Sequence, residues 1–118
     1  MAKKYERLGV MIDMSRNAVM NIPALKEYLQ LLKKMGYNSV MIYTEDTYEV
    51  EGEPFFGYMR GRYTIDEMKD MVEYADSKGV EMIPCIQTLA HLPRMFQWPV
   101  YNEINDIKDK QNKDVKKF

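Results

Sequence analysis

The segment SVMIY, Ser39 to Tyr43, decides the fold, because it is a short apolar run that ends directly at the polar residues TED. Similar apolar runs lie before and after it, at Leu8–Ile12 and Val80–Ile86, and predict two further strands. Residues at helical spacing occupy both intervals, so the predicted order is β-α-β-α-β. Nearly continuous apolar strands in this order are typical of a parallel α/β sheet with crossover helices. Pro84 in the last run indicates an edge or an irregularity.

Both predicted helices have marked ends. Pro23 suits the first turn of the first helix, and Gly36 suits its C-terminal cap. The second helix begins at a capping box of Thr64 and Glu67 and ends at Gly79. Because crossovers are right-handed, strands in sequential order place both helices on one face and leave the opposite face uncovered. The predicted buried stripes are Leu25, Tyr28, Leu29, Leu32 and Met35 in the first helix and Ile65, Met68, Met71, Val72 and Ala75 in the second.

The composition predicts one soluble domain. Of the 118 residues, 46% are hydrophobic, which is enough to build a core. Lys and Arg number 17 against 18 Asp and Glu, so the charge gives no case for binding nucleic acid or an anionic membrane. The single cysteine, Cys85, excludes an intrachain disulfide and fits a reducing compartment, and the start, MAKKYERLGVMID, lacks the long apolar run of a signal peptide. We therefore expect a cytoplasmic location.

Common cofactor and catalytic motifs are missing from the sequence. It contains no GxGxxG or GxxxxGK[ST] after a strand, and no CxxC, HExxH or GxSxG. Five carboxylates lie between Glu45 and Glu53 and could suggest a hard cation. Their spacing is not that of an EF-hand loop, however, and favours a solvated acidic loop. We expect neither a metal nor another cofactor.

Polar residues follow each predicted strand at its carboxyl end. Asp13 and Arg16 come after the first strand, Glu45 and Asp46 after the second, and His91 after the third. Ligands of open α/β sheets and of barrels bind beyond the carboxyl ends of parallel strands. These three groups are therefore the candidate site, with Arg16 facing a rim that carries carboxylates.

Each candidate also has a purely structural explanation. Arg16 could pair with Asp13 or Asp46 and fix the loop, and His91 could be a hydrogen-bonded core residue. Cys85 lies inside a strand and is expected to be a small buried hydrophobe. Four aromatic residues are expected to pack, although near a rim they could stack on a sugar or another flat ligand: Phe55, Phe56, Tyr58 and Trp98.

Three motifs together carry a resemblance to a known family. "GVMIDMSRNAVM", "MIYTEDTYEVEGEPFFGYMRGRYT" and "GVEMIPCIQTLAHL" resemble the start of the catalytic barrel of glycoside hydrolase family 20, the β-N-acetylhexosaminidases. The resemblance runs from about Leu8 to about Ile107 and involves three loops in the right order. It implies that residues 1–107 form the first three strands of a (β/α)₈ TIM barrel, the N-terminal part of the catalytic domain.

The resemblance implies a role for each matching residue. Arg16, in DMSRN, matches the arginine that hydrogen-bonds hydroxyls of the terminal N-acetylhexosamine, which suits its forked donors. Asp46, in YTEDTY, matches an acidic residue that supports the catalytic network, and Glu45 is its neighbour in the same motif. His91, in TLAHL, matches a histidine that helps to orient the catalytic acid.

The family's reaction, as the resemblance implies it, is substrate-assisted hydrolysis of terminal N-acetylglucosamine or N-acetylgalactosamine from glycans. The acetamido oxygen of the sugar attacks the anomeric carbon, a glutamate protonates the leaving oxygen, and a neighbouring aspartate positions the acetamido group. Asp66 and Glu67 form the pair DE here, but they open a helix and lack the family's surrounding pattern. The catalytic pair is therefore missing, and we expect the isolated chain to be inactive.

The C-terminus departs from the family. Residues 108–118 read KDKQNKDVKKF, a polar Lys-rich tail that we expect to be disordered or a frayed helix. A complete barrel needs roughly 250 residues, so a truncated segment is expected. Its uncovered sheet face and open edges would expose apolar surface and unpaired backbone groups, which predicts a homo-oligomer.

Two other interpretations remain open. The chain could be a complete small α/β domain that uses Arg16, Asp46 and His91 for an unrelated ligand. It could also be an assembly module in which the rim only joins loops. Replacement of Arg16 by Ala separates them, because a structural role predicts lost stability and a binding role predicts lost affinity.

Overall fold

The computed structural model describes residues 5–16 and 18–105 of the chain. Strands and helices alternate as predicted, and two short 3-10 helices follow the last strand. The elements are β1 (Gly9–Asp13), α1 (Ile22–Lys34), β2 (Ser39–Thr44), α2 (Ile65–Ser77), β3 (Glu81–Ile86), η1 (Met95–Gln97) and η2 (Pro99–Ile104). Each strand lies within one residue of its predicted bounds. The predicted tail, residues 108–118, lies outside the described residues.

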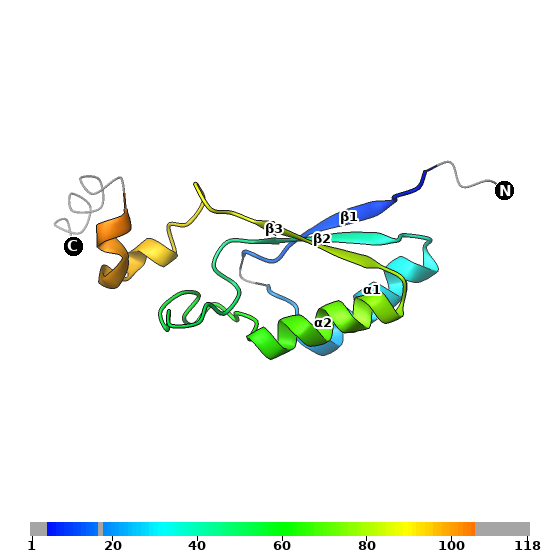
Figure 1. Ribbon diagram of the computed structural model, residues 1–118, viewed down its shortest axis with the longest axis horizontal. Coiled ribbons are helices and arrows are strands. Elements are labelled where there is room, and N and C mark those ends of the chain that lie inside the picture. The colour runs from blue at the N-terminus through cyan, green and yellow to red at the C-terminus, as the bar shows by residue number, and fades with distance from the viewer. Residues whose placement is uncertain (1–4, 17, 106–118) are drawn as a thin grey trace.

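The three strands form one parallel sheet in the order β1-β2-β3. Met11 is paired with Met41, and Met41 is paired with Ile83, so the strands run in step across the sheet. Helices α1 and α2 lie against the same face of the sheet (Figure 1). The expectation that both helices cover one face of sequential strands is therefore confirmed, and within the described residues the opposite face has no covering layer.

Strand β3 is an edge strand, as Pro84 indicated. The N–H groups of Glu81 and Gln87 donate to Asn38 O (2.9 Å) and Thr44 O (3.1 Å), so the backbone N–H groups of odd-numbered residues in β3 point toward β2. The backbone N–H groups of successive residues in a parallel strand point to opposite neighbouring strands. The missing N–H of Pro84 therefore lies on the outer edge, where it costs no bond to β2.

The helix ends follow the predicted capping. Thr64 Oγ1 accepts a hydrogen bond from the N–H of Glu67 (3.1 Å), and the Glu67 carboxylate accepts one from the N–H of Thr64 (2.8 Å). Asn21 is the N-cap of helix α1, and its side chain accepts a hydrogen bond from the N–H of Ala24 (3.0 Å). Caps of this kind stabilise a helix by about 1 kcal/mol. Asp66 and Glu67 thus belong to a helix start, as expected.

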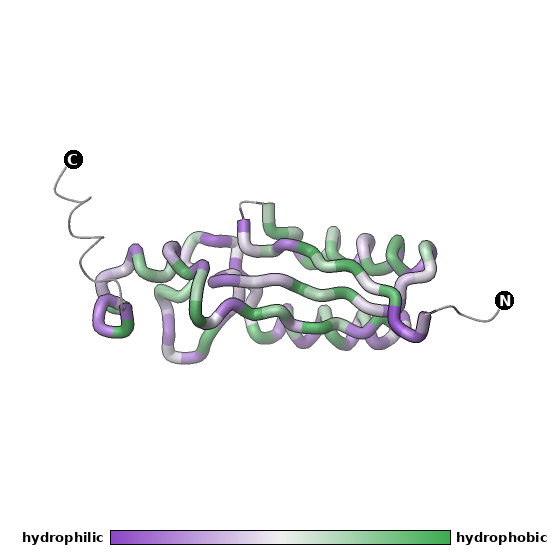
Figure 2. The backbone as a smooth tube through the Cα atoms, turned by 90° about the horizontal axis from the view of Figure 1, so that it is seen from above, coloured by the Kyte–Doolittle hydropathy of each residue, from purple (hydrophilic) through white to green (hydrophobic). Residues whose placement is uncertain are grey.

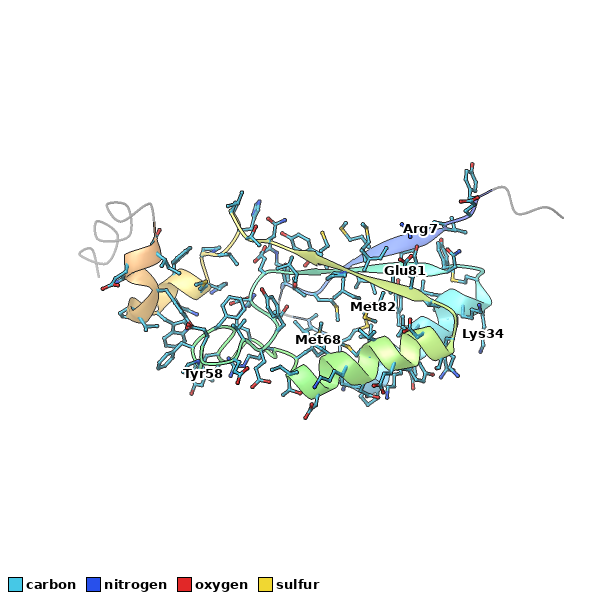
Figure 3. All side chains as sticks on the ribbon, viewed as in Figure 1. Arg7, Lys34, Tyr58, Met68, Glu81 and Met82 are labelled. Carbon is cyan, nitrogen blue, oxygen red and sulfur yellow. The ribbon has the colours of Figure 1, made fainter. Side chains whose placement is uncertain are left out.

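The core lies between the sheet and the two helices. Met68 of α2 and Met82 of β3 point toward one another in this layer (Figure 3). Complete burial of a leucine stabilises the fold by about 1.5–3 kcal/mol, and three leucines of α1 contribute to this layer. The buried apolar residues of the layer include Leu25, Leu29, Leu32, Val40, Ile42, Met71, Ala75 and Val80.

Part of the predicted stripes is wrong, because Met35, Ile65 and Val72 are exposed. Ile65 and Val72 line an apolar groove of about 510 Å³ between α2 and β3, together with Met82 and Ile86. This side of α2 has no helix beside it in the described part of the chain. The apolar spacing in the sequence therefore identifies a face of α2 on which no other described element packs.

The uncovered face of the sheet also carries apolar side chains. Met11 and Met41 are 56% and 38% exposed, and they lie side by side on this face. Figure 2, which views the chain from above, shows hydrophobic stretches along the strands. Cys85 lies inside β3 as predicted, in register with Tyr43 on the same face, but it is only half-buried there.

The connection between β2 and α2 folds back beside the carboxyl ends of the strands (Figure 1). The N–H of Tyr63 donates to Thr47 O (3.0 Å), and the ring centroids of Phe55 and Tyr58 each lie 5.5 Å from that of Trp98. Phe56 packs edge-on against Tyr48. The predicted packing role of the aromatic residues is confirmed. No helix in the described ranges is both long and apolar enough to cross a bilayer.

Candidate functional site

Arg16 and Glu45 form an ion pair beyond the carboxyl ends of β1 and β2. The Arg16 Nη1 to Glu45 Oε2 distance is 3.3 Å. The Glu45 side chain is 1% exposed, whereas that of Arg16 is 65% exposed. The expected pairing of Arg16 with Asp13 or Asp46 is wrong, because Glu45 provides the carboxylate that its guanidinium contacts. A buried anion therefore holds one end of a guanidinium that otherwise faces solvent.

The second oxygen of Glu45 is also occupied. The Tyr43 hydroxyl donates to Glu45 Oε1 over 3.2 Å. Loss of solvation raises the pKa of Tyr43, and the negative charge of Glu45 raises it further. The phenol therefore stays protonated and keeps its donor on Glu45. With one partner on each oxygen, the carboxylate of Glu45 has a fixed orientation.

Asp46 is held by a different arginine. Arg60 Nε lies 3.3 Å from Asp46 Oδ1, and the two side chains are 12% and 2% exposed. The same guanidinium donates through Nη2 to the backbone oxygen of Ser15. Buried charge pairs of this kind are costly to break, because removal of one partner leaves the other uncompensated. Arg60 was not among the predicted site residues.

Asp13 fixes the start of the loop that carries Arg16. Its Oδ1 accepts from Ser15 Oγ (2.6 Å) and from the Ser15 N–H (2.9 Å). These hydrogen bonds, first the side-chain bond and then the backbone bond, lower the pKa of Asp13, and the nearby charge of Arg16 contributes in the same direction. Asp13 is therefore a loop anchor and remains ionised.

His91 lies farther along the segment that follows β3. Its side chain is exposed, and its backbone has a positive φ of 60°, which is uncommon for a residue with a Cβ atom. The interpretation of His91 as a buried core histidine is wrong. Among the described residues, no hydrogen bond or ion pair connects His91 to Glu45 or Asp46. The structure thus joins the first two predicted loops but leaves the third apart.

The acidic segment after β2 does not form a metal site. Glu45 and Asp46 are each paired with an arginine, and Glu49 accepts a hydrogen bond from the N–H of Ile65 (3.0 Å). Within residues 5–16 and 18–105, no three His, Cys, Asp or Glu side chains are grouped as metal ligands. The charged group that faces solvent at this rim is the guanidinium of Arg16, whose N–H groups are hydrogen-bond donors.

Sequence comparison finds two hexosaminidases. Human hexosaminidase D is 23% identical over 92 residues, which cover 78% of this chain and 19% of the human protein. Bovine hexosaminidase D is 29% identical over 83 residues, which cover 70% of this chain and 24% of that protein. The chain thus spans about a fifth to a quarter of the length of these relatives. No family model matches the chain.

Similar solved structures are β-hexosaminidases. The family 20 β-N-acetylhexosaminidase of Streptomyces coelicolor matches with a TM-score of 0.73 at 20% identity, over 87% of this chain and 23% of that one. The Streptomyces plicatus enzyme in complex with Thio-NAglucal has a TM-score of 0.71, also at 20% identity, with the same shares covered. A D313A mutant of a Streptomyces plicatus β-hexosaminidase, in complex with the product GlcNAc, matches with a TM-score of 0.61 at 22% identity, over 69% of this chain and 19% of that chain.

Fold and comparisons together define an α/β chain that has the architecture of the first three strands of a TIM-barrel glycosidase domain. The predicted resemblance to glycoside hydrolase family 20 is confirmed: the chain is similar to the N-terminal portion of a β-N-acetylhexosaminidase catalytic domain.

Proposed function

We propose that this chain provides the sugar-binding part of a β-N-acetylhexosaminidase catalytic domain, with Arg16 as the residue that binds hydroxyls of a terminal N-acetylhexosamine. The observation that carries this proposal is the ion pair of Arg16 with the buried Glu45. A guanidinium has five N–H donors, and Glu45 is its one ion-pair partner among the described residues. The remaining donors match two adjacent hydroxyls of a pyranose.

In this proposal, the residues around Arg16 serve to aim it. Glu45 fixes the guanidinium, and Tyr43 fixes Glu45. Asp46, held by Arg60, supports the network at the same rim, and His91 would join it when a sugar or a further part of the domain contacts the segment after β3. None of these side chains transfers the proton that cleaves the glycosidic bond.

The bond-breaking groups of the complete enzyme would come from polypeptide beyond the three strands. The parent enzyme would hydrolyse terminal N-acetylglucosamine or N-acetylgalactosamine, with the substrate's acetamido oxygen as the nucleophile and a glutamate as the general acid. Glu67 cannot be that acid in this fold, because its carboxylate accepts the capping hydrogen bond from Thr64. The isolated chain should therefore show no turnover of a chromogenic N-acetylglucosaminide, and Glu67→Gln should affect only stability.

Self-association of the chain is a second part of the proposal. Met11 and Met41 on the uncovered face, and the groove between α2 and β3, favour contact with other apolar surface. This property also fits the alternative of an assembly domain, which would show the same association without binding a sugar. A cytoplasmic location remains a prediction from the single cysteine.

Chemical-shift mapping of the ¹⁵N-labelled chain with N-acetylglucosamine tests the binding site. We expect the largest shifts at Asp13 to Arg16 and at Tyr43 to Asp46. A sugar analogue that lacks the 4-hydroxyl should bind more weakly, because one donor of Arg16 would lose its acceptor. Shifts confined to the amino ends of the strands, or no shifts at millimolar sugar, would refute the proposed site.

A further inference from the structure

We propose that Arg60 is a positioning residue of this site, which holds the loop carrying Arg16 against the loop carrying Glu45 and Asp46. The inference rests on the proposed function, because it explains how the sugar-binding guanidinium is aimed. Arg60 lies in the connection between β2 and α2, 44 positions beyond Arg16 in the sequence. Its guanidinium bonds to the side chain of Asp46 and to the backbone of Ser15, so it acts on Arg16 through these two residues.

The contacts of Arg60 join the two site loops. Its Nε donates to Asp46 Oδ1 at 3.3 Å, and its Nη2 donates to the backbone oxygen of Ser15. That oxygen belongs to the peptide group between Ser15 and Arg16. A planar guanidinium can donate along two directions at once, and an ammonium group is a single point charge. One side chain therefore ties a carboxylate of the second loop to the peptide that precedes Arg16.

The Ser15 residue is clamped from both sides. Its N–H and hydroxyl donate to Asp13, and its carbonyl accepts from Arg60. Thr47 adds a parallel link, because its hydroxyl donates to Met14 O over 2.6 Å. Ser15 and Thr47 are both fully buried. The backbone just before Arg16 thus has little freedom. Arg60 provides the hydrogen bond that ties it to the loop after β2, which contains Asp46.

The loop of Arg60 is shaped to bring this side chain into the site. A Cβ atom at Gly57 would lie 2.0 Å from Asp46 O, and Gly57 has a φ of +67°. Only glycine allows the backbone to approach Asp46 so closely in this conformation. Met59 and Gly61 on either side of Arg60 also have positive φ values. The segment 57–61 therefore turns sharply against Asp46 and directs Arg60 inward.

A neighbouring arginine shows what a purely local role looks like. Arg62 donates to Pro54 O (3.1 Å) and to Phe56 O, both within its own loop. Arg60 and Arg62 are two residues apart and both bind backbone carbonyls, but of the two only Arg60 also reaches the loop that follows β1. Arg62 is therefore a matched control for Arg60.

The test compares Arg60→Lys and Arg62→Lys in the full chain. Lysine keeps a positive charge near Asp46, which protects the fold, but cannot supply both donors of the guanidinium. We would measure the Kd of N-acetylglucosamine by NMR titration and the hydrogen-exchange rates of the Met14 and Ser15 amides. Loss of one or two hydrogen bonds predicts that Arg60→Lys raises the Kd about fivefold or more and speeds Ser15 exchange by a similar factor, with Arg62→Lys close to wild type.

The two readouts separate this inference from the proposed function. If the wild-type chain binds no sugar, the proposed function fails, and the exchange rate of Ser15 still decides whether Arg60 positions the loop. Unchanged exchange at Ser15 in Arg60→Lys would overturn the inference in either case. Equal weakening of sugar binding by Arg60→Lys and Arg62→Lys, with exchange faster throughout the chain, would also overturn it, because that pattern reflects general destabilisation.

Discussion

Glu45 and Asp46 are neighbours in the chain, and each carboxylate is held by a different arginine. Glu45 pairs with the exposed Arg16, and Asp46 pairs with the nearly buried Arg60. The nitrogen-to-oxygen distance is 3.3 Å in both ion pairs. Both residues lie in the bend that follows β2. Glu45 accepts a hydrogen bond from the hydroxyl of Tyr43, whereas Asp46 accepts one from Arg60 of the returning loop. One acidic pair serves two separate connections.

The two ion pairs should differ strongly in their contribution to stability. Arg60→Gln leaves the charge of buried Asp46 without its partner, which should cost about 3–5 kcal/mol. Arg16→Gln also takes the cation away from a buried carboxylate, but Tyr43 still donates to Glu45 and Arg16 itself is largely exposed, so the loss should be smaller, about 1–2 kcal/mol. Urea unfolding followed by circular dichroism measures both. Equal losses for the two variants would contradict the distinction between a structural and a ligand-facing arginine.

Acid should destabilise the wild-type chain more than Ser15→Ala. The hydrogen bonds from Ser15 hold the pKa of Asp13 below its ordinary value in the folded chain. A group with a lowered folded pKa adds stability that is present above its unfolded pKa of about 3.9 and is lost as the pH falls through the folded value. The stability difference between wild type and Ser15→Ala should therefore be larger at pH 6 than at pH 2.5. An equal difference at both pH values would argue against this role of Ser15.

Alkaline pH should weaken the fold through Tyr63. Burial, with a smaller effect of the Glu67 charge, raises the pKa of Tyr63 to about 12. The folded chain favours the neutral phenol, so the stabilisation is complete below about pH 10 and is lost as the pH rises through about 12. At most about 3 kcal/mol is involved, because each pKa unit corresponds to about 1.4 kcal/mol.

Tyr63→Phe should flatten the pH dependence of stability between pH 9.5 and 11.5. Its stability at neutral pH should fall by about 1 kcal/mol, since Tyr63 donates a hydrogen bond to Met20 O. The role assigned to Tyr63 is wrong if the slope persists in Tyr63→Phe.

Self-association should depend on the uncovered sheet face. Light scattering at micromolar concentration should give a mass above the 14.0 kDa of one chain. Met41→Lys should shift the mass toward the monomer, because a charge in the centre of this face opposes its burial. Leu31→Lys, at an exposed position of α1, should leave the mass unchanged. A well-folded wild-type monomer would rule out the proposed association.

The sequence predicted the sheet well because its signals are local. The capping box of Thr64 and Glu67 and the apolar runs of the strands depend on residues that are near one another in the chain. The partner of Arg16 was missed, since both acidic residues follow β2 directly.

Arg60 could not be assigned in advance, because its position depends on the path of a long loop. That path requires positive φ angles at Gly57 and Gly61 and also at Met59, where the residue type gives no signal. The exposure of Ile65 and Val72 was equally hidden, because helical periodicity identifies an apolar face but not whether another element packs on it.

The most direct test of a sugar site at Arg16 compares it with a second arginine that lies beyond the opposite end of β1. Arg7 and Arg16 flank β1, are each 65% exposed and each pair with a glutamate, but Arg7 lies at the amino end beside Glu81 (Figure 3). The measurement is the Kd of N-acetylglucosamine for Arg16→Gln and Arg7→Gln. We predict that Arg16→Gln weakens binding about tenfold or more, with Arg7→Gln at the wild-type value. Equal affinities for the two variants would contradict a sugar site at Arg16.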